Sequence, residues 1–241
     1  MLQAIIFDMD GVIIDSHPVH RQAWQRFLLT LGKRVSETDL DCILEGWRRE
    51  DILRHFLGDL TNAQVLEYGN RKDEFFQQAE VPMKPVSGLC EFLYHLELRG
   101  IRKAVATSAS ERRTRITLEQ LQLTRYFASV VTAKDVLRGK PDPAVYLLAA
   151  EQMRALPEHI VVIEDSVSGV KAAKSAGMKC LGIARHSRRK VLRQAGADNV
   201  IPDFAGLTLD RLELLVRPPR PDHELESRRR SPATMKSSVP L

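Results

Sequence analysis

The chain has 241 residues, of which 44% are hydrophobic and 28% charged, which suits one large domain or two modest ones with a real core. The formal net charge is +5, but residues 217–241 alone hold six Lys or Arg against three Asp or Glu. The rest of the chain therefore carries only about +2, too little to predict a nucleic-acid partner.

The cysteines and the apolar runs indicate the compartment of the protein and its relation to membranes. Cys42, Cys90 and Cys180 lie far apart, and none belongs to a CxxC pair, so we expect reduced thiols in a cytoplasmic enzyme. The first apolar run stops at Phe7, and no segment is long enough to span a membrane, so no membrane partner is expected. We expect a monomer or a weak dimer.

Six short apolar runs predict buried strands. They cover residues 4–7, 103–107, 129–132, 159–163, 179–184 and 199–201. The runs are continuous rather than alternating, which is typical of parallel strands covered on both faces. Helix-period segments separate them, as at 89–100 and 170–177. This alternation predicts an α/β fold with a doubly wound, mostly parallel, Rossmann-like sheet.

One block, from residue 17 to about residue 80, interrupts the alternation and contains no good strand. An amphipathic helix over 17–32 and further helical segments over 49–58 and 63–79 fill it. We therefore predict a helical cap at 17–83, inserted between the two parts of an α/β core. The expected core covers 1–16 and 84–216, and the Pro-, Ser- and Arg-rich end, 217–241, is expected to be a disordered tail.

Polar side chains follow four of the predicted strands, where each strand ends. In chain order they are Asp8 and Asp10, Thr107 and Ser108, Lys140, and Glu164 and Asp165. The carboxyl ends of parallel strands meet at one edge of a sheet, so we expect these side chains to share one crevice. The segment Ser108–Glu111 fits a capping box, which would offer backbone N–H groups to an anion there.

This set of residues has a chemical logic. Several carboxylates in one place need a cation, and all-oxygen ligands suit Mg²⁺. The metal and Lys140 would attract a phosphate, and Thr107 can donate a hydrogen bond to a phosphoryl oxygen. Asp8 could then attack phosphorus, while Asp10 acts first as general acid and then as base. Alone, each motif is better explained as a turn, a helix cap or a calcium loop, but the ordered set is not.

The order of these motifs, with their D-x-D-G start, resembles the haloacid dehalogenase (HAD) superfamily of phosphotransferases over residues 4–215. The resemblance implies an aspartyl-phosphate on Asp8, with Asp10 as acid and base and Thr107 and Lys140 in the catalytic set. It also implies that Mg²⁺ binds to four residues: Asp8, Asp10 through its carbonyl, Glu164 and Asp165. Ser108 and Ala109 would lie at the substrate.

The helical block most resembles the cap of the β-phosphoglucomutase-like sugar phosphatases. The segment Gly46–Asp51 matches their G-x-x-R-E-D loop, in which Arg49 would hold the phosphate that is not transferred. Lys72 would work with His20 when the cap closes, and Trp24 shares a helix face with His20. The resemblance thus implies five cap residues at the substrate: His20, Trp24, Gly46, Arg49 and Lys72. Each also has a simpler interpretation, as a surface, hinge or core residue.

The activity within this group stays open. Glu45 stands where the resemblance leads us to expect a lysine, and Trp47 and Arg48 make the loop bulkier, which favours a phosphatase acting on a small sugar phosphate. The alternative is a β-phosphoglucomutase interconverting β-glucose 1-phosphate and glucose 6-phosphate. A 2-haloacid dehalogenase would not need Asp10 or the metal acids, and a binding module would leave the acid set unexplained.

Overall fold

A six-stranded parallel sheet forms the centre of the computed structural model, which describes residues 1–43, 47–79 and 83–217. The strands are β1 (Ala4–Phe7), β2 (Arg102–Ala106), β3 (Ser129–Val131), β4 (Ile160–Glu164), β5 (Lys179–Ile183) and β6 (Asn199–Ile201). Their spatial order is β3-β2-β1-β4-β5-β6, so the chain winds outward from β1 in both directions. The predicted doubly wound α/β fold is confirmed, with each strand within one residue of its expected bounds.

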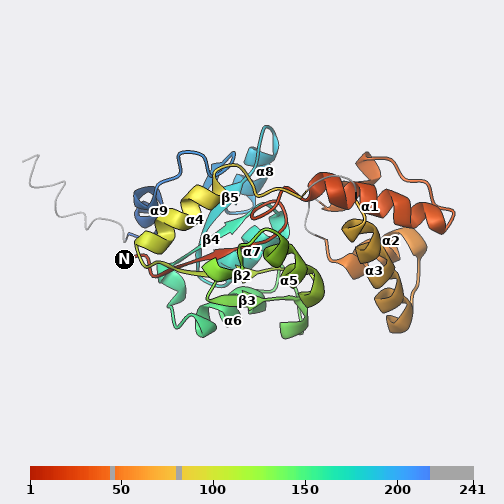
Figure 1. The fold of residues 1–241 in the computed structure, drawn as a ribbon, viewed down its shortest axis with the longest axis horizontal. Helices are drawn as coiled ribbons and strands as arrows, with labels where there is room; N and C mark the ends of the chain where they lie inside the picture. Colours follow the sequence, from red (N-terminus) through yellow and green to blue (C-terminus); the bar gives the residue numbers. More distant parts are fainter. Residues whose placement is uncertain (44–46, 80–82, 218–241) are drawn as a thin grey trace, which may run out of the picture.

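The register of the central strands aligns their carboxyl ends. Phe7 pairs with Val105 of β2 on one side and with Ile163 of β4 on the other. The residues that follow these strands therefore emerge at the same edge of the sheet. Figure 1 shows that β1 runs from the N-terminus toward α1, α2 and α3, which lie at this edge.

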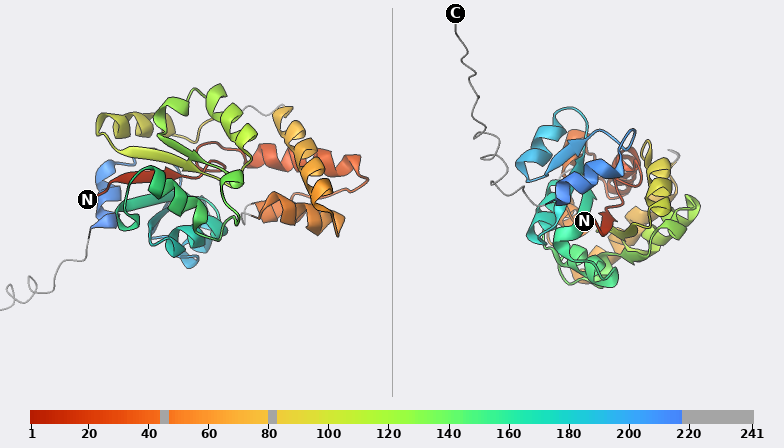
Figure 2. Two further views of the ribbon diagram at one scale, coloured as in Figure 1. Left: turned by 90° about the horizontal axis from the view of Figure 1, so that it is seen from below. Right: turned by 90° about the vertical axis from the view of Figure 1, so that its left-hand side faces the viewer.

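The helices of the described residues are α1 (His17–Thr30), α2 (Arg49–Leu57), α3 (Asn62–Gln77), α4 (Leu89–Leu98), α5 (Glu111–Gln120), α6 (Ala144–Gln152), α7 (Val167–Ser175), α8 (Arg188–Gln194) and α9 (Leu209–Val216). Of these, α4 to α9 cover the two faces of the sheet, as Figures 1 and 2 show. Short 3₁₀ helices lie at Thr38–Ile43, Thr124–Tyr126, Ala133–Asp135 and Pro157–His159. No helix in the described part of the chain has the length and apolar character that crossing a membrane requires.

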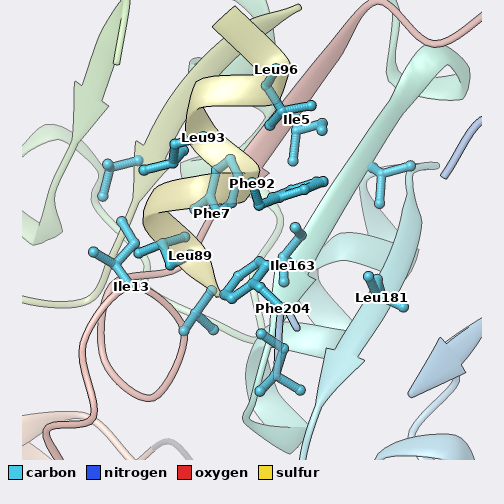
Figure 3. Close-up of a cluster of buried hydrophobic side chains, with 14 of the residues drawn as sticks. Ile5, Phe7, Ile13, Leu89, Phe92, Leu93, Leu96, Ile163, Leu181 and Phe204 are labelled. Atoms are coloured by element: carbon cyan, nitrogen blue, oxygen red, sulfur yellow. The ribbon is translucent and has the colours of Figure 1, made fainter. Parts of the chain in front are cut away.

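Alternating residues of β1 build two separate cores. Ile5 and Phe7 face the core formed with α4 and α9, whereas Ala4 and Ile6 face the core formed with α6 and α7. In the first core, drawn in Figure 3, the ring of Phe92 on α4 stacks on Phe204 with centroids 5.5 Å apart. The two buried faces hold β1, and with it the start of the polar edge, in a fixed position.

Helices α1, α2 and α3, with the segments that join them, form what we call the helical insert, residues 17–79. Trp24, Phe27 and Leu28 of α1 pack with Ile52 and Leu53 of α2 in a hydrophobic cluster of their own. Figures 1 and 2 show the insert beyond the carboxyl edge of the sheet. Gly46 and Glu45, and the tail beyond Arg217, lie outside the described residues.

The start of α3 rests on a capping box that gives a stability prediction. The Thr61 side chain accepts a hydrogen bond from the Gln64 backbone N–H, and the Gln64 side chain accepts from the Thr61 N–H. We expect Thr61→Ala to lower the free energy of unfolding by about 1 kcal/mol. Thr61→Ser keeps the acceptor and should cost less than half of that. Equilibrium urea unfolding checks both, and equal losses in the two variants would contradict the capping role.

Candidate active site

A cleft of about 450 Å³ lies between the carboxyl edge of the sheet and the helical insert. From the sheet side it is lined by Asp8, Asp10, Thr107, Ser108, Ala109, Lys140, Glu164 and Asp165. From the insert it is lined by His20, Trp24, Arg49 and Lys72. The structure thus brings together every predicted site residue except Gly46, which lies outside the described residues.

Lys140 connects two buried carboxylates at the floor of the cleft. Its ammonium donates to Oδ1 of Asp8 at 2.6 Å and to Oε1 of Glu164 at 2.7 Å. Burial raises the pKa of Asp8 well above its usual value, and Lys140 opposes this only in part because nearby carboxylates repel the charge. Burial acts on Glu164 too, but there Lys140 prevails and the pKa is lowered. An ionised Asp8 therefore favours a further cation in the site.

Asp10 is held from the opposite side by Arg113, a residue of α5. The guanidinium donates to both carboxylate oxygens, at 2.9 Å to Oδ1 and 2.6 Å to Oδ2. Ser16 and His20 also donate to Oδ1, at 2.7 and 3.1 Å. Burial would raise the pKa of Asp10, but Arg113 and His20 outweigh it and hold the pKa well below its usual value. Oδ2 takes only the Arg113 contact among the described residues, so it has the most room to reach a ligand.

His20 and Lys72 form a buried pair between Asp10 and the insert. Lys72 Nζ lies 2.9 Å from Nδ1 of His20, whose Nε2 faces Asp10. Burial and the charge of Lys72 lower the pKa of His20 to about 3, so the ring is neutral at physiological pH. These partners assign the tautomer: Nε2–H donates to Asp10, and Nδ1 accepts from Lys72. Burial also lowers the pKa of Lys72, to about 7.

Trp24 belongs to the core of the insert more than to the cleft. It is 2% exposed, its ring packs edge-on against Phe27, and Lys72 Nζ lies 5.5 Å from its centroid. Trp24 also supports the position of Lys72. Because it lines the cleft, its contact with the substrate stays a prediction.

Arg49 is held against α3 by two features. Its guanidinium donates to Oδ2 of Asp73 at 2.9 Å, and it lies so close to Gly69 that a Cβ there would stand 2.6 Å from Cζ. The same Asp73 oxygen accepts from Ser110 Oγ of the sheet side at 3.3 Å. Asp73 therefore connects the helical insert to Ser110, the N-cap residue of α5.

Gly11 lies beside the oxygen atoms that could bind a metal. Asp165 packs so tightly there that a Cβ on Gly11 would lie 2.2 Å from its Oδ2, which also contacts His17 Nε2 at 2.7 Å. This glycine, with φ +73°, lets the Asp165 carboxylate approach the chain next to Asp10. The donor set of Asp8, Asp165 and the Asp10 carbonyl fits a hard cation such as Mg²⁺.

Glu164, the fourth predicted metal ligand, accepts hydrogen bonds at both of its carboxylate oxygens. Oε1 accepts from Lys140 and from Tyr146 at 2.9 Å, and Oε2 accepts from the Ser166 N–H at 2.7 Å. These contacts orient Lys140 toward Asp8, and the direct binding of a metal by Glu164 stays a prediction. No three His, Cys, Asp or Glu side chains among the described residues form a complete metal site by themselves. The third ligand in the set above is a backbone carbonyl.

The loop after β2 differs from the expected capping box. Ser110, not Ser108, caps α5, and its hydroxyl accepts from the Arg113 N–H at 3.4 Å. Thr107 Oγ1 accepts from the Ala109 N–H at 3.1 Å, so its own hydrogen is available to a ligand. Sequence reasoning missed Arg113, Tyr146 and Asp73. The available signal for Arg113 was its place in the first turn of the helix that leaves the predicted site edge.

A carboxylate beside a fixed cation at the carboxyl edge of a parallel sheet is an arrangement that can carry out nucleophilic phosphoryl transfer. Residues 5–183 match the family model described as haloacid dehalogenase-like hydrolase. The chain belongs to this family, and it is an enzyme.

The relatives lie in the same group. A phosphorylated carbohydrates phosphatase of Thermotoga maritima is 36% identical over 200 residues, 81% of this chain and 92% of that protein. A beta-phosphoglucomutase of Bacillus subtilis is 30% identical over 220 residues, 88% of this chain and 94% of that protein. The crystal structure of CbbY from Rhodobacter sphaeroides in complex with phosphate superposes with a TM-score of 0.78 at 27% identity, covering 88% of this chain and 100% of that one.

Proposed function

We propose that the chain is a Mg²⁺-dependent phosphatase that hydrolyses a small phosphorylated sugar through an aspartyl-phosphate on Asp8. The observation that carries this proposal is the buried 2.6 Å contact between Lys140 and Asp8 at the carboxyl edge of the sheet. It holds the nucleophilic carboxylate beside a fixed cation that a transferring phosphoryl group would also contact. The phosphatase relative named for phosphorylated carbohydrates supports the substrate class.

Two carboxylates would divide the chemistry. Asp8 attacks phosphorus and the ester bond breaks, while the leaving oxygen takes a proton from Asp10, which must carry that proton when the substrate binds although Arg113 favours its ionised form in the free site. Asp10 then takes a proton from water, which attacks the phosphorus of the aspartyl-phosphate, releases inorganic phosphate and restores Asp8. Thr107 would donate its free hydroxyl hydrogen to a phosphoryl oxygen. Lys140 stays in contact with Asp8 and Glu164 throughout.

The metal would be held by Asp8, Glu164, Asp165 and the Asp10 carbonyl. When bound, Mg²⁺ would supply positive charge that polarises the phosphoryl group. His17 of α1 lies next to these ligands, since its Nε2 is 2.7 Å from Oδ2 of Asp165. Gly11 keeps the approach open, since any side chain there would meet the Asp165 carboxylate.

The proposed cap is residues 17–83, which contain the helical insert, and the proposed core is residues 1–16 and 84–216. It would cover the cleft during transfer and contact the sugar through His20, Arg49 and Lys72, opposite Ser108 and Ala109. Its polar contacts to the core, from His20 to Asp10 and from Asp73 to Ser110, support a closed position.

A second candidate is a β-phosphoglucomutase. The pair of His20 and Lys72 favours it, because it joins the insert to the acid and base Asp10 and so could place a sugar hydroxyl there instead of water. The Bacillus relative supports the same activity. The two candidates share every step on Asp8 and differ in which hydroxyl accepts the phosphoryl group.

One assay separates the candidates. Purified protein with Mg²⁺ is incubated with a panel of sugar monophosphates, and with β-glucose 1-phosphate plus a trace of glucose 1,6-bisphosphate. We expect inorganic phosphate from at least one monophosphate, with the activity lost in EDTA and restored by Mg²⁺. Glucose 6-phosphate formed without free phosphate would favour the mutase instead. No reaction with any phosphoester would contradict both.

A further inference from the structure

The charges that line the cleft are already paired. Six Lys or Arg side chains face seven Asp or Glu side chains among the described lining residues. Arg113 pairs with Asp10, Lys140 with Asp8, Arg48 with Glu50, Lys134 with Glu111, and Arg49 with Asp73, all within 3 Å, and Lys72 lies 3.7 Å from Asp73. Each described cation of the cleft thus has a carboxylate partner.

This balance limits the negative charge that a ligand can bring. With every Lys and Arg of the lining counted as charged and both histidines as neutral, a bound divalent cation would leave one net positive charge, which a single phosphate dianion already exceeds. Lys140 and the metal set belong to the transferred phosphate. On the side of the helical insert a second anionic group would meet Arg48, Arg49 and Lys72.

Asp73 of α3 lies beside Arg49 and Lys72 on the insert side of the cleft. It is 8% exposed and holds the Arg49 guanidinium, which also lies on the α3 backbone at Gly69. A second phosphate that reached for Arg49 would meet the Asp73 carboxylate at the same place and be repelled by it. Hydroxyl groups would meet no such repulsion, because Arg49 can donate to them and Asp73 can accept from them.

We propose that Asp73 is a specificity-determining residue that restricts the enzyme to phosphate esters whose remainder is neutral, such as polyols and sugars with one phosphate. This inference rests on the proposed function, which supplies the transferred phosphate. It names the charge class of the substrate, and it disfavours a catalytic cycle that passes through a sugar bisphosphate.

Asp73→Asn tests this with little change in shape. Arg49 and Ser110 both contact Oδ2, so an amide oxygen in that position keeps both hydrogen bonds while the charge is removed. The matched control is Glu74→Gln, which removes the same charge from the exposed side of α3. The measurement is the Kd of glucose 1,6-bisphosphate and of glucose 6-phosphate by calorimetry with Mg²⁺, in chains that also carry Asp8→Asn to prevent turnover.

We expect Asp73→Asn to shift the ratio of the two Kd values toward the bisphosphate by about tenfold or more, and Glu74→Gln by less than about threefold. A shift below threefold in Asp73→Asn, or an equal shift in Glu74→Gln, would overturn the inference. The proposed function is judged separately by phosphate release from monophosphates in the unsubstituted chain. A failure of the proposed function would appear as absent phosphate release. A failure of the Asp73 inference would appear as an unchanged ratio of the two Kd values.

Discussion

Asp8→Asn is expected to lower phosphate release by roughly 10⁴-fold or more, because an amide cannot form the acyl-phosphate bond on which both half-reactions depend. The shape of the side chain is kept, and Lys140 retains Glu164 as its partner. Steady-state kinetics with the best monophosphate of the panel measures the loss. Residual activity above about one per cent of the unsubstituted rate would contradict the role of Asp8 as nucleophile.

The same substitution should not weaken the fold. Burial raises the folded-state pKa of Asp8 above its unfolded value, so ionising Asp8 destabilises the metal-free protein as the pH rises above the unfolded pKa. A neutral Asn removes this cost at neutral pH. We therefore expect the Tm of the Asp8→Asn chain in EDTA to equal or exceed that of the unsubstituted chain. This result separates a loss of chemistry from a loss of folding.

Arg113→Met is expected to reduce kcat for a sugar phosphate by about 10²- to 10³-fold, because Arg113 positions the acid and base Asp10. The guanidinium spans both oxygens of Asp10, and its Cζ lies 5.0 Å from the ring centroid of Phe76 on α3. Without it, Asp10 keeps only Ser16 and His20 on one oxygen. We expect Arg113→Lys, which keeps the charge but loses the two-point contact, to recover part of the rate.

The leaving group distinguishes positioning from a general structural effect. p-Nitrophenolate leaves without a proton, so the first turnover of p-nitrophenyl phosphate should slow by less than about tenfold in Arg113→Met, well below the loss with a sugar phosphate. Arg112→Met, an exposed neighbour on α5, serves as the control and should leave both substrates unaffected. Equal losses for the two substrates would mean that Arg113 does not act through Asp10.

The strands and the polar edge could be predicted because they follow from local patterns. A buried parallel strand needs a continuous apolar run, and the end of each run fixes which polar residue reaches the common edge. Asp8, Thr107, Lys140 and Asp165 therefore line the cleft as expected. The register that aligns β1 with β2 and β4 turns four separate motifs into one site.

The partners of these residues could not be predicted in the same way. Arg113 and Asp10 are separated by 103 residues, and neither apolar periodicity nor motif spacing indicates which cation reaches which acid. The partners of Glu164 were equally invisible in the sequence, since nothing there indicates that Tyr146 and Ser166 donate to its carboxylate. Which charges cancel in the cleft depends on such long-range contacts, as the pairing of Arg49 with Asp73 illustrates.

The most direct test of the account is chemical trapping of the phosphorylated aspartate. Borohydride reduces an acyl phosphate to an alcohol, so quenching the enzyme during turnover should convert Asp8 into homoserine. Peptide mass spectrometry then locates the change. We predict homoserine at position 8 only when Mg²⁺ and substrate are both present, and none in the Asp8→Asn chain. Rapid phosphate release with Asp8 unchanged, or trapping at another residue, would contradict phosphoryl transfer through Asp8.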